Sequence, residues 1–106
     1  MSYLVRANPD LAELIAQVTG PAPRSGGVAS FLGLVRDRHQ GKTVLGIEYS
    51  AYEPMAEAIC ETIVGEARSR WPVRVALQHR LGGLRVGDTA VAVVAAGEHR
   101  DEAFAA

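Results

Sequence analysis

The amino-acid sequence predicts an α+β fold, in which a mostly antiparallel sheet is covered by one long helix. Two apolar runs, 27–35 and 91–96, contain almost no polar residue, which is typical of strands buried on both faces. Between them, residues 54–71 carry apolar side chains at helical spacing, and Pro72 ends this pattern. Because 106 residues have room for one core, we expect a single domain over residues 1–106.

The first quarter of the chain predicts a short strand, a helix and a loop. Residues 2–6 suit a strand, and Asn8 is the expected N-cap of a helix that begins at Pro9 and ends near Val18. Its apolar residues share one face, which should pack into the core. Residues 19–27 are too rich in proline and glycine for regular structure, so we expect a loop there.

The apolar run that begins at Gly27 should form a strand that is buried on both faces and carries two arginines to the edge of the sheet. Gly33 in its middle predicts a bulge or a close approach of another segment. Residues 39–42 are polar and should form a mobile loop that includes Lys42, the only lysine of the chain. Residues 44–52 are β-branched and aromatic, and they predict a second strand antiparallel to the first.

The long helix should run from Pro54 to about Trp71, with its apolar face on the sheet. That face consists of residues at every fourth position, with further apolar residues beside them: Met55, Ile59, Ile63, Ala67 and Trp71, and next to these Ala56, Cys60 and Val64. Cys60 lies beside this face, so we interpret it as a small buried hydrophobic residue rather than a nucleophile.

The last third of the chain predicts two strands and a third helix. Strands at 73–79 and 89–96 are joined through a turn at Gly87-Asp88, and the second of them should be central in the sheet. Residues 97–104 should begin a helix, since acidic residues fall in its first turn. A helix of barely two turns is marginal alone, so we expect the natural protein to continue past Ala106.

Composition limits the classes of function. The formal net charge is -1, so no global field recruits nucleic acid or an anionic membrane, and any anion must be bound locally. The single cysteine, Cys60, excludes an intramolecular disulfide and a cysteine cage for zinc, and it fits a reducing compartment. No apolar run approaches the roughly 20 residues that span a bilayer, and residues 1–6 are too short for a signal peptide. We therefore expect a cytoplasmic protein.

Cationic side chains are the candidates for chemistry. Arg36 and Arg38 follow the first long strand, and His99 and Arg100 begin the third helix, where the helix dipole disfavours cations unless an anion binds. Backbone amides with arginine side chains make a phosphate site. The alternative interpretation is that these arginines, like Lys42, are simply solvated.

A metal site is the weaker hypothesis. His39, His79 and His99 are far apart in the sequence and lack the close spacing that would place two ligands on one face. We expect neither a metal nor a cofactor.

Four parts of the chain together resemble the large, catalytic subunit of molybdopterin synthase. They are residues 27–37, residues 48–55, segments 66–72 and 79–82, and segments 86–88 and 99–104. The joint pattern covers most of residues 27–106 and is more specific than any single motif. The first 26 residues fit the family loosely.

The resemblance implies an α/β-hammerhead type fold and a sulfurtransferase of molybdenum cofactor biosynthesis. In that family, the C-terminal thiocarboxylate of a small ubiquitin-like carrier subunit enters a pocket and donates sulfur to cyclic pyranopterin monophosphate. Two rounds form the dithiolene of molybdopterin. The resemblance also implies a homodimer of large subunits with a carrier on each, which makes a heterotetramer.

The resemblance also implies positions for the site. Residues at the end of the first long strand and at the start of the third helix would contact substrate: Phe31, Leu34, Val35, Arg36, His99 and Arg100. Of these, Arg36, His99 and Arg100 are the predicted catalytic residues, with His99 and Arg100 supplied across the dimer. Fixed cations there would hold the thiocarboxylate and the substrate phosphate.

The chain departs from the family at its C-terminal end. Family members carry two functional lysines in the segment that follows the start of this helix, one near the helix end and one after it, and Lys42 matches neither. We therefore expect residues 1–106 alone to bind the carrier without forming molybdopterin. The competing interpretation is a non-catalytic dimeric module that binds a ubiquitin-like carrier tail or a small phosphorylated ligand.

Overall fold

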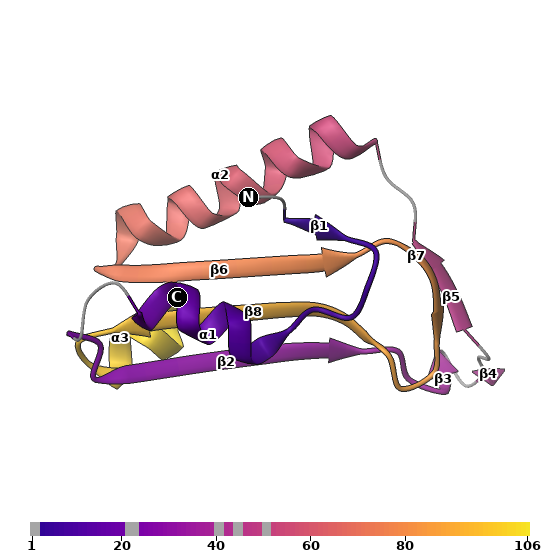
Figure 1. Ribbon diagram of the computed structural model, residues 1–106, viewed down its shortest axis with the longest axis horizontal. Coiled ribbons are helices and arrows are strands. Elements are labelled where there is room, and N and C mark those ends of the chain that lie inside the picture. The colour runs from indigo at the N-terminus through magenta and orange to yellow at the C-terminus, as the bar shows by residue number, and fades with distance from the viewer. Residues whose placement is uncertain (1–2, 21–23, 40–41, 44–45, 50–51) are drawn as a thin grey trace.

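The structure is a computed structural model that describes residues 3–20, 24–39, 42–43, 46–49 and 52–106 (Figure 1). Its main sheet has four strands in the order β1 (Leu4–Val5), β6 (Val73–Arg80), β8 (Thr89–Gly97) and β2 (Gly27–Leu34). Two smaller ladders pair β3 (Arg38–His39) with β4 (Lys42–Thr43) and β5 (Gly46–Tyr49) with β7 (Gly82–Arg85). The described helices are α1 (Leu11–Thr19), α2 (Glu53–Arg70) and α3 (Arg100–Ala105).

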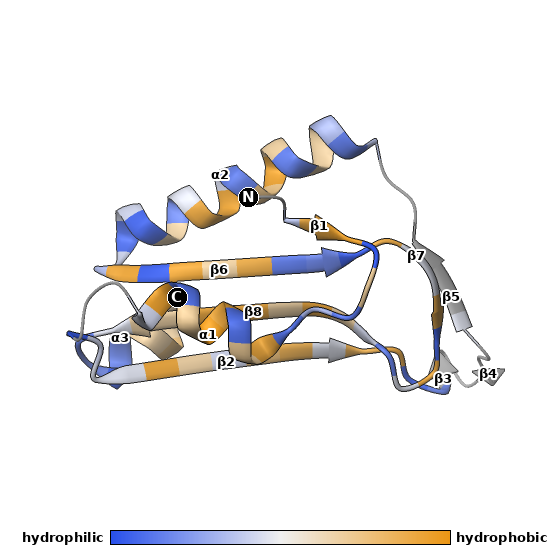
Figure 2. Ribbon diagram, viewed as in Figure 1, coloured by the Kyte–Doolittle hydropathy of each residue, from blue (hydrophilic) through white to orange (hydrophobic). Residues whose placement is uncertain are grey.

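β8 is the central strand, as its apolar composition predicts. It pairs antiparallel with β6 on one side and with β2 on the other. Ala92 and Val94 are 0% exposed and pack with Leu14 and Val18 of α1. Small residues on β8 let α1 lie close to the sheet, and hydrophobic residues dominate this strand in Figure 2.

β2 is exposed along much of its length, so the prediction of a strand buried on both faces is wrong. Phe31 is 62% exposed and Leu34 is 58% exposed. The apolar run reports hydrophobicity, but the strand order gives β2 a partner on one side only within the described sheet. The predicted irregularity at Gly33 is confirmed: the register shifts between Gly33 and Leu34, and a Cβ on Gly33 would lie 2.6 Å from Cγ1 of Val91.

The helix α1 is confirmed, but its N-cap is Asp10 rather than Asn8. The Asp10 carboxylate accepts a hydrogen bond from the Glu13 backbone N–H at 3.2 Å. The Asn8 side chain instead accepts from Arg80, so a tertiary contact takes it away from the helix.

The second predicted strand forms, but with a different partner. Its described part, β5, pairs antiparallel with β7, whereas we expected it beside the first long strand. The sequence analysis missed β7, because Gly82 and Gly83 suggest a turn; Gly82 does adopt φ +99° at the start of the strand. The polar segment expected as a loop contributes β3 and β4, while residues 40–41 within it lie outside the described residues.

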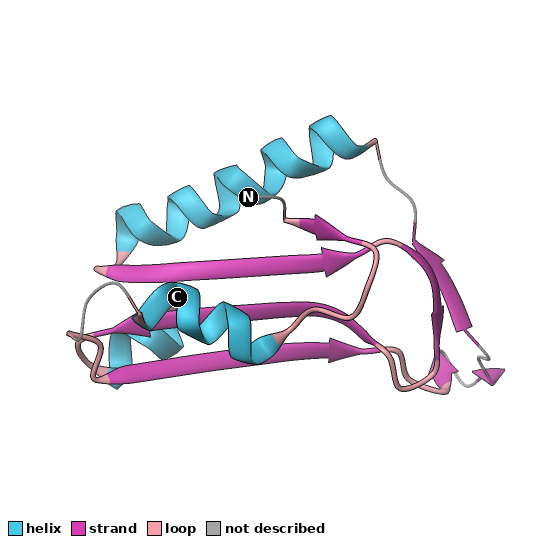
Figure 3. Cartoon of the chain, viewed as in Figure 1, coloured by secondary structure: helices cyan, strands magenta, loops and turns pink. Residues whose placement is uncertain are grey.

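The bounds of α2 are confirmed, and its predicted apolar face is confirmed at Val64 but wrong at Met55, Ile59 and Ile63. Met55, Ile59 and Ile63 are 61%, 53% and 53% exposed, and Val64 is 1% exposed. The helix packs on β6 and β1, at one side of the sheet in the view of Figure 3. The buried stripe therefore runs through Val64, at the side of the predicted face, rather than through Ile59 and Ile63.

The third helix is confirmed and lies across the sheet from α1. A Cβ on Gly97 would lie 3.2 Å from the Glu102 carboxylate, whereas its neighbour Ala96 belongs to the core under α1. Successive residues of a strand point to opposite faces, so α1 and α3 cover opposite faces of the sheet. A Cβ on Gly27 would lie 2.8 Å from Cα of Arg100, so α3 begins beside the start of β2.

Candidate functional site

The first group of predicted site residues lies at the C-terminal end of β2. Phe31 and Leu34 are exposed on the strand, and Arg36 is exposed just beyond it. Val35 is 4% exposed, and its side chain packs with Leu84 and Ala90 in a small core of its own. This end of β2 therefore exposes one guanidinium group and two apolar side chains next to the buried Val35.

The second group lies at the opposite end of the same strand. His99 is the N-cap residue of α3 and Arg100 is its first residue, and both are exposed. Because α3 begins beside Gly27, nine residues of extended chain, or roughly 30 Å, separate this pair from Arg36. One subunit therefore does not bring the predicted residues together, and a shared pocket requires a second copy.

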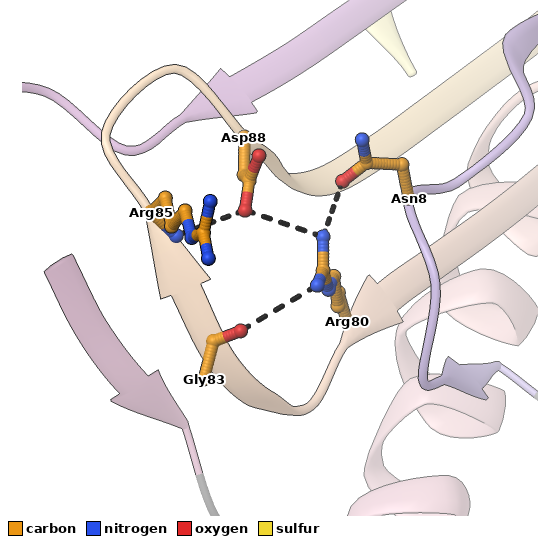
Figure 4. Close-up of polar contacts among 5 residues, drawn as sticks. All are labelled: Asn8, Arg80, Gly83, Arg85 and Asp88. Atoms are coloured by element: carbon orange, nitrogen blue, oxygen red, sulfur yellow. Dashed lines mark hydrogen bonds and ion pairs between the residues drawn. The ribbon is translucent and has the colours of Figure 1, made fainter.

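A network of polar contacts that the sequence analysis did not predict lies next to the first group, centred on Arg80 and Asp88 (Figure 4). Arg80 Nη1 donates to Asn8 Oδ1 at 2.6 Å and lies 3.4 Å from Asp88 Oδ2, and Arg80 Nη2 lies 3.5 Å from the Gly83 carbonyl oxygen. Asp88 Oδ2 also accepts from the Arg85 backbone N–H at 2.8 Å. The motifs at 79–82 and 86–88 were the sequence signal for these residues.

A cleft in the surface lies away from both groups of predicted site residues. It has a volume of about 680 Å³ and is lined by α1, α2 and β6, with Tyr3, Glu61 and Arg68 among its residues and none of the predicted site residues. The Tyr3 hydroxyl donates to the Glu61 carboxylate, and this hydrogen bond, with burial, raises the pKa of Tyr3 to about 12. The Glu57 carboxylate accepts from the Tyr3 and Leu4 backbone N–H groups at 3.0 and 2.8 Å. These contacts join β1 to α2.

Two further findings concern the described residues as a set. They contain no cluster of three or more metal-ligating side chains, and His79 and His99 are attached to opposite ends of the sheet. None of the three described helices combines the length and apolar character needed to cross a membrane.

Comparison with known proteins identifies the family. Residues 4–106 match the family model described as MoaE protein. The chain belongs to the MoaE family. A protein from Nostoc named molybdopterin synthase catalytic subunit is 45% identical over an alignment of 84 residues, and the match covers 77% of this chain and 51% of that protein. A Mycobacterium tuberculosis protein named molybdopterin synthase catalytic subunit 1 is 42% identical over 93 residues, which are 87% of this chain and 62% of the relative.

The MoaE fold is also supported by a solved structure. The crystal structure of molybdopterin synthase from Staphylococcus aureus superposes with a TM-score of 0.91 at 28% identity, covering 98% of this chain and 75% of that one. The α+β fold expected from the resemblance is therefore confirmed. The matched part of this chain spans between about half and two thirds of the two named relatives.

Proposed function

We propose that this chain is the part of a molybdopterin synthase catalytic subunit that binds the two anionic reactants of sulfur transfer. The donor is the thiocarboxylate at the C-terminus of a small ubiquitin-like carrier subunit, and the acceptor is cyclic pyranopterin monophosphate. Membership of the MoaE family carries the proposal. Exposed cations at Arg36 and at His99-Arg100 support it, since nothing in a net charge of -1 attracts anions otherwise.

The pocket is assembled from two subunits. Arg36 of one copy and His99 with Arg100 of another hold the anions from opposite sides. The edge position of β2 supports this arrangement, because Phe31 and Leu34 are exposed beside an open strand edge. A carrier subunit on each copy completes a heterotetramer.

The two arginines bind and orient rather than exchange protons. An arginine stays protonated at neutral pH, so Arg36 and Arg100 are neither nucleophiles nor proton shuttles. Their planar guanidinium groups suit the paired oxygen and sulfur atoms of a thiocarboxylate and the oxygens of a phosphate. Holding both reactants in register supplies rate enhancement without further chemistry from these residues.

Replacing Arg36 by alanine tests the proposal. The assay combines the full-length gene product with thiocarboxylated carrier and precursor, and it measures dithiolene formation. A lost hydrogen bond to a charged group amounts to about 1.5–3 kcal/mol, so kcat/KM should fall roughly tenfold to a hundredfold. Arg6→Ala is the matched control, because the Arg6 side chain is 67% exposed and pairs with Glu53 at 3.1 Å, away from β2. Equal turnover in Arg36→Ala and wild type would contradict the proposal.

A further inference from the structure

We infer that Arg80 and Asp88 are positioning residues that hold the segment carrying Arg36 in its place. The importance of that segment rests on the proposed function, whereas the holding contacts are properties of the fold. The regular ladder between β2 and β8 ends at the pair Leu34–Thr89, immediately after the register shift. Whatever fixes the chain beyond Leu34 must therefore be something other than that ladder.

The turn before β8 supplies the contacts that the ladder lacks. The Val35 backbone N–H donates to the Asp88 carbonyl oxygen at 3.0 Å, and the Gly87 N–H donates to the Val35 carbonyl oxygen at 2.8 Å. Gly87 has φ +91°, a conformation that glycine adopts without strain. Both backbone polar groups of Val35 are thus bonded to one turn, and Arg36 is the next residue.

The side chain of Asp88 in turn fixes the shape of this turn. Its Oδ2 accepts from the Arg85 N–H at 2.8 Å and faces Arg80 Nη1 at 3.4 Å. The Arg80 and Asp88 side chains are 19% and 27% exposed, compared with 67% and 54% for Arg6 and Glu53. A partly buried, charge-assisted contact holds geometry better than an exposed ion pair does.

Arg80 anchors the turn to two other parts of the fold. Its guanidinium bonds Asn8, just before α1, and lies beside the Gly83 carbonyl oxygen of β7 (Figure 4). Arg36 itself makes no hydrogen bond or ion pair to another described residue. The backbone therefore sets the point from which its side chain reaches, and the chain of contacts from Arg80 through Asp88 to Val35 holds the backbone directly before it.

The test combines an activity-independent measurement with a double-mutant cycle. Asp88→Asn keeps the shape and an acceptor for the Arg85 N–H, but it loses the charge that faces Arg80. Amide hydrogen exchange at Val35 should become roughly tenfold faster, the factor expected when a contact to a charged group is lost. In full-length enzyme, kcat/KM should fall between roughly tenfold and a hundredfold, since a displacement of about 1 Å can cost about a hundredfold in rate.

The same substitution in an Arg36→Ala background separates positioning from general damage. If Asp88 acts through Arg36, Asp88→Asn should cost less than about twofold there. An equal loss in both backgrounds, or unchanged exchange at Val35, would overturn the inference. Arg80→Lys, which keeps the charge and loses the planar fork, provides a second variant in case Asp88→Asn does not fold, with the same expected results. Arg6→Gln is the control and should change neither measurement. Faster exchange at Val35 with full activity in Arg36→Ala would support the holding role and refute the proposed function alone.

Discussion

Replacing Val64 by alanine should destabilise the protein, whereas the same replacement at the adjacent Ile63 should not. Val64 is 1% exposed and Ile63 is 53% exposed, although both are branched aliphatic residues of α2. Val64→Ala removes two buried methyl groups at about 0.5–1.5 kcal/mol each, and the better helix propensity of alanine returns about 0.5 kcal/mol. The expected loss is about 1.5 kcal/mol. For Ile63→Ala, partial burial and propensity offset each other, and the change should stay within about 0.5 kcal/mol.

Urea and thermal unfolding of both variants would check this prediction. A loss of about 1.5 kcal/mol lowers Tm by roughly 6–12 °C in a domain of this size. An equal loss in Ile63→Ala would refute the placement of α2, because the Met55–Ile59–Ile63 stripe would then have to be buried. Repeating the melts over a range of protein concentrations separates burial within one chain from burial between copies, since only the latter makes Tm depend on concentration.

Three further predictions follow from single residues. Gly65→Ala should stabilise the protein by about 0.5–1 kcal/mol, because a Cβ meets no atom within 4 Å in this helical position. Gly87→Ala should destabilise the protein by about 1–2 kcal/mol, because Gly87 has φ +91°. Urea melts that rank the two variants the other way would contradict both predictions. Because the pKa of Tyr3 is raised, its hydrogen bond to Glu61 stabilises the fold fully below pH 10.0 and is lost as the pH rises through about 12. The difference in free energy of unfolding between wild type and Tyr3→Phe should therefore narrow over that range. A constant difference would count against the Glu61 contact. Burial, and to a smaller extent the nearby Glu57 carboxylate, raise the pKa of the Cys60 thiol. Cys60 in the folded protein should therefore react with a thiol reagent more slowly than free cysteine does at neutral pH. An equal rate would be inconsistent with this environment.

The sequence predicts the helices and strands of this fold better than it predicts which strands pair and which helix faces are buried. The run at 91–96 predicts the central strand β8, because uninterrupted small apolar residues tolerate close packing on both faces. The same argument fails for β2, because hydrophobicity along a strand does not report which strands flank it. On α2, a one-residue shift of the buried stripe separates Val64 from Ile63, and helical periodicity alone does not resolve that shift in a helix with apolar residues on more than one side.

The candidate site shows the same division. The position of Arg36 at a strand end and of His99 at a helix start follows from local patterns. The contacts that hold Arg36 do not, since Arg80 and Asp88 meet through tertiary pairing of β6 with the turn before β8. The strand β7 was likewise not predicted, because its two glycines, Gly82 and Gly83, are unfavourable in a strand and its pairing with β5 is a tertiary contact.

Mixing two impaired variants of the full-length protein tests the two-subunit pocket most directly. One variant carries Arg36→Ala and the other carries His99→Ala with Arg100→Ala. If each pocket takes Arg36 from one copy and the helix pair from the other, subunit exchange at equal amounts makes half of the dimers mixed, and each mixed dimer regains one intact pocket. Dithiolene formation should then recover to about a quarter of the wild-type rate, as expected for a two-fold dimer. Activity in the mixture that stays at the level of the separate variants after confirmed subunit exchange would contradict the account.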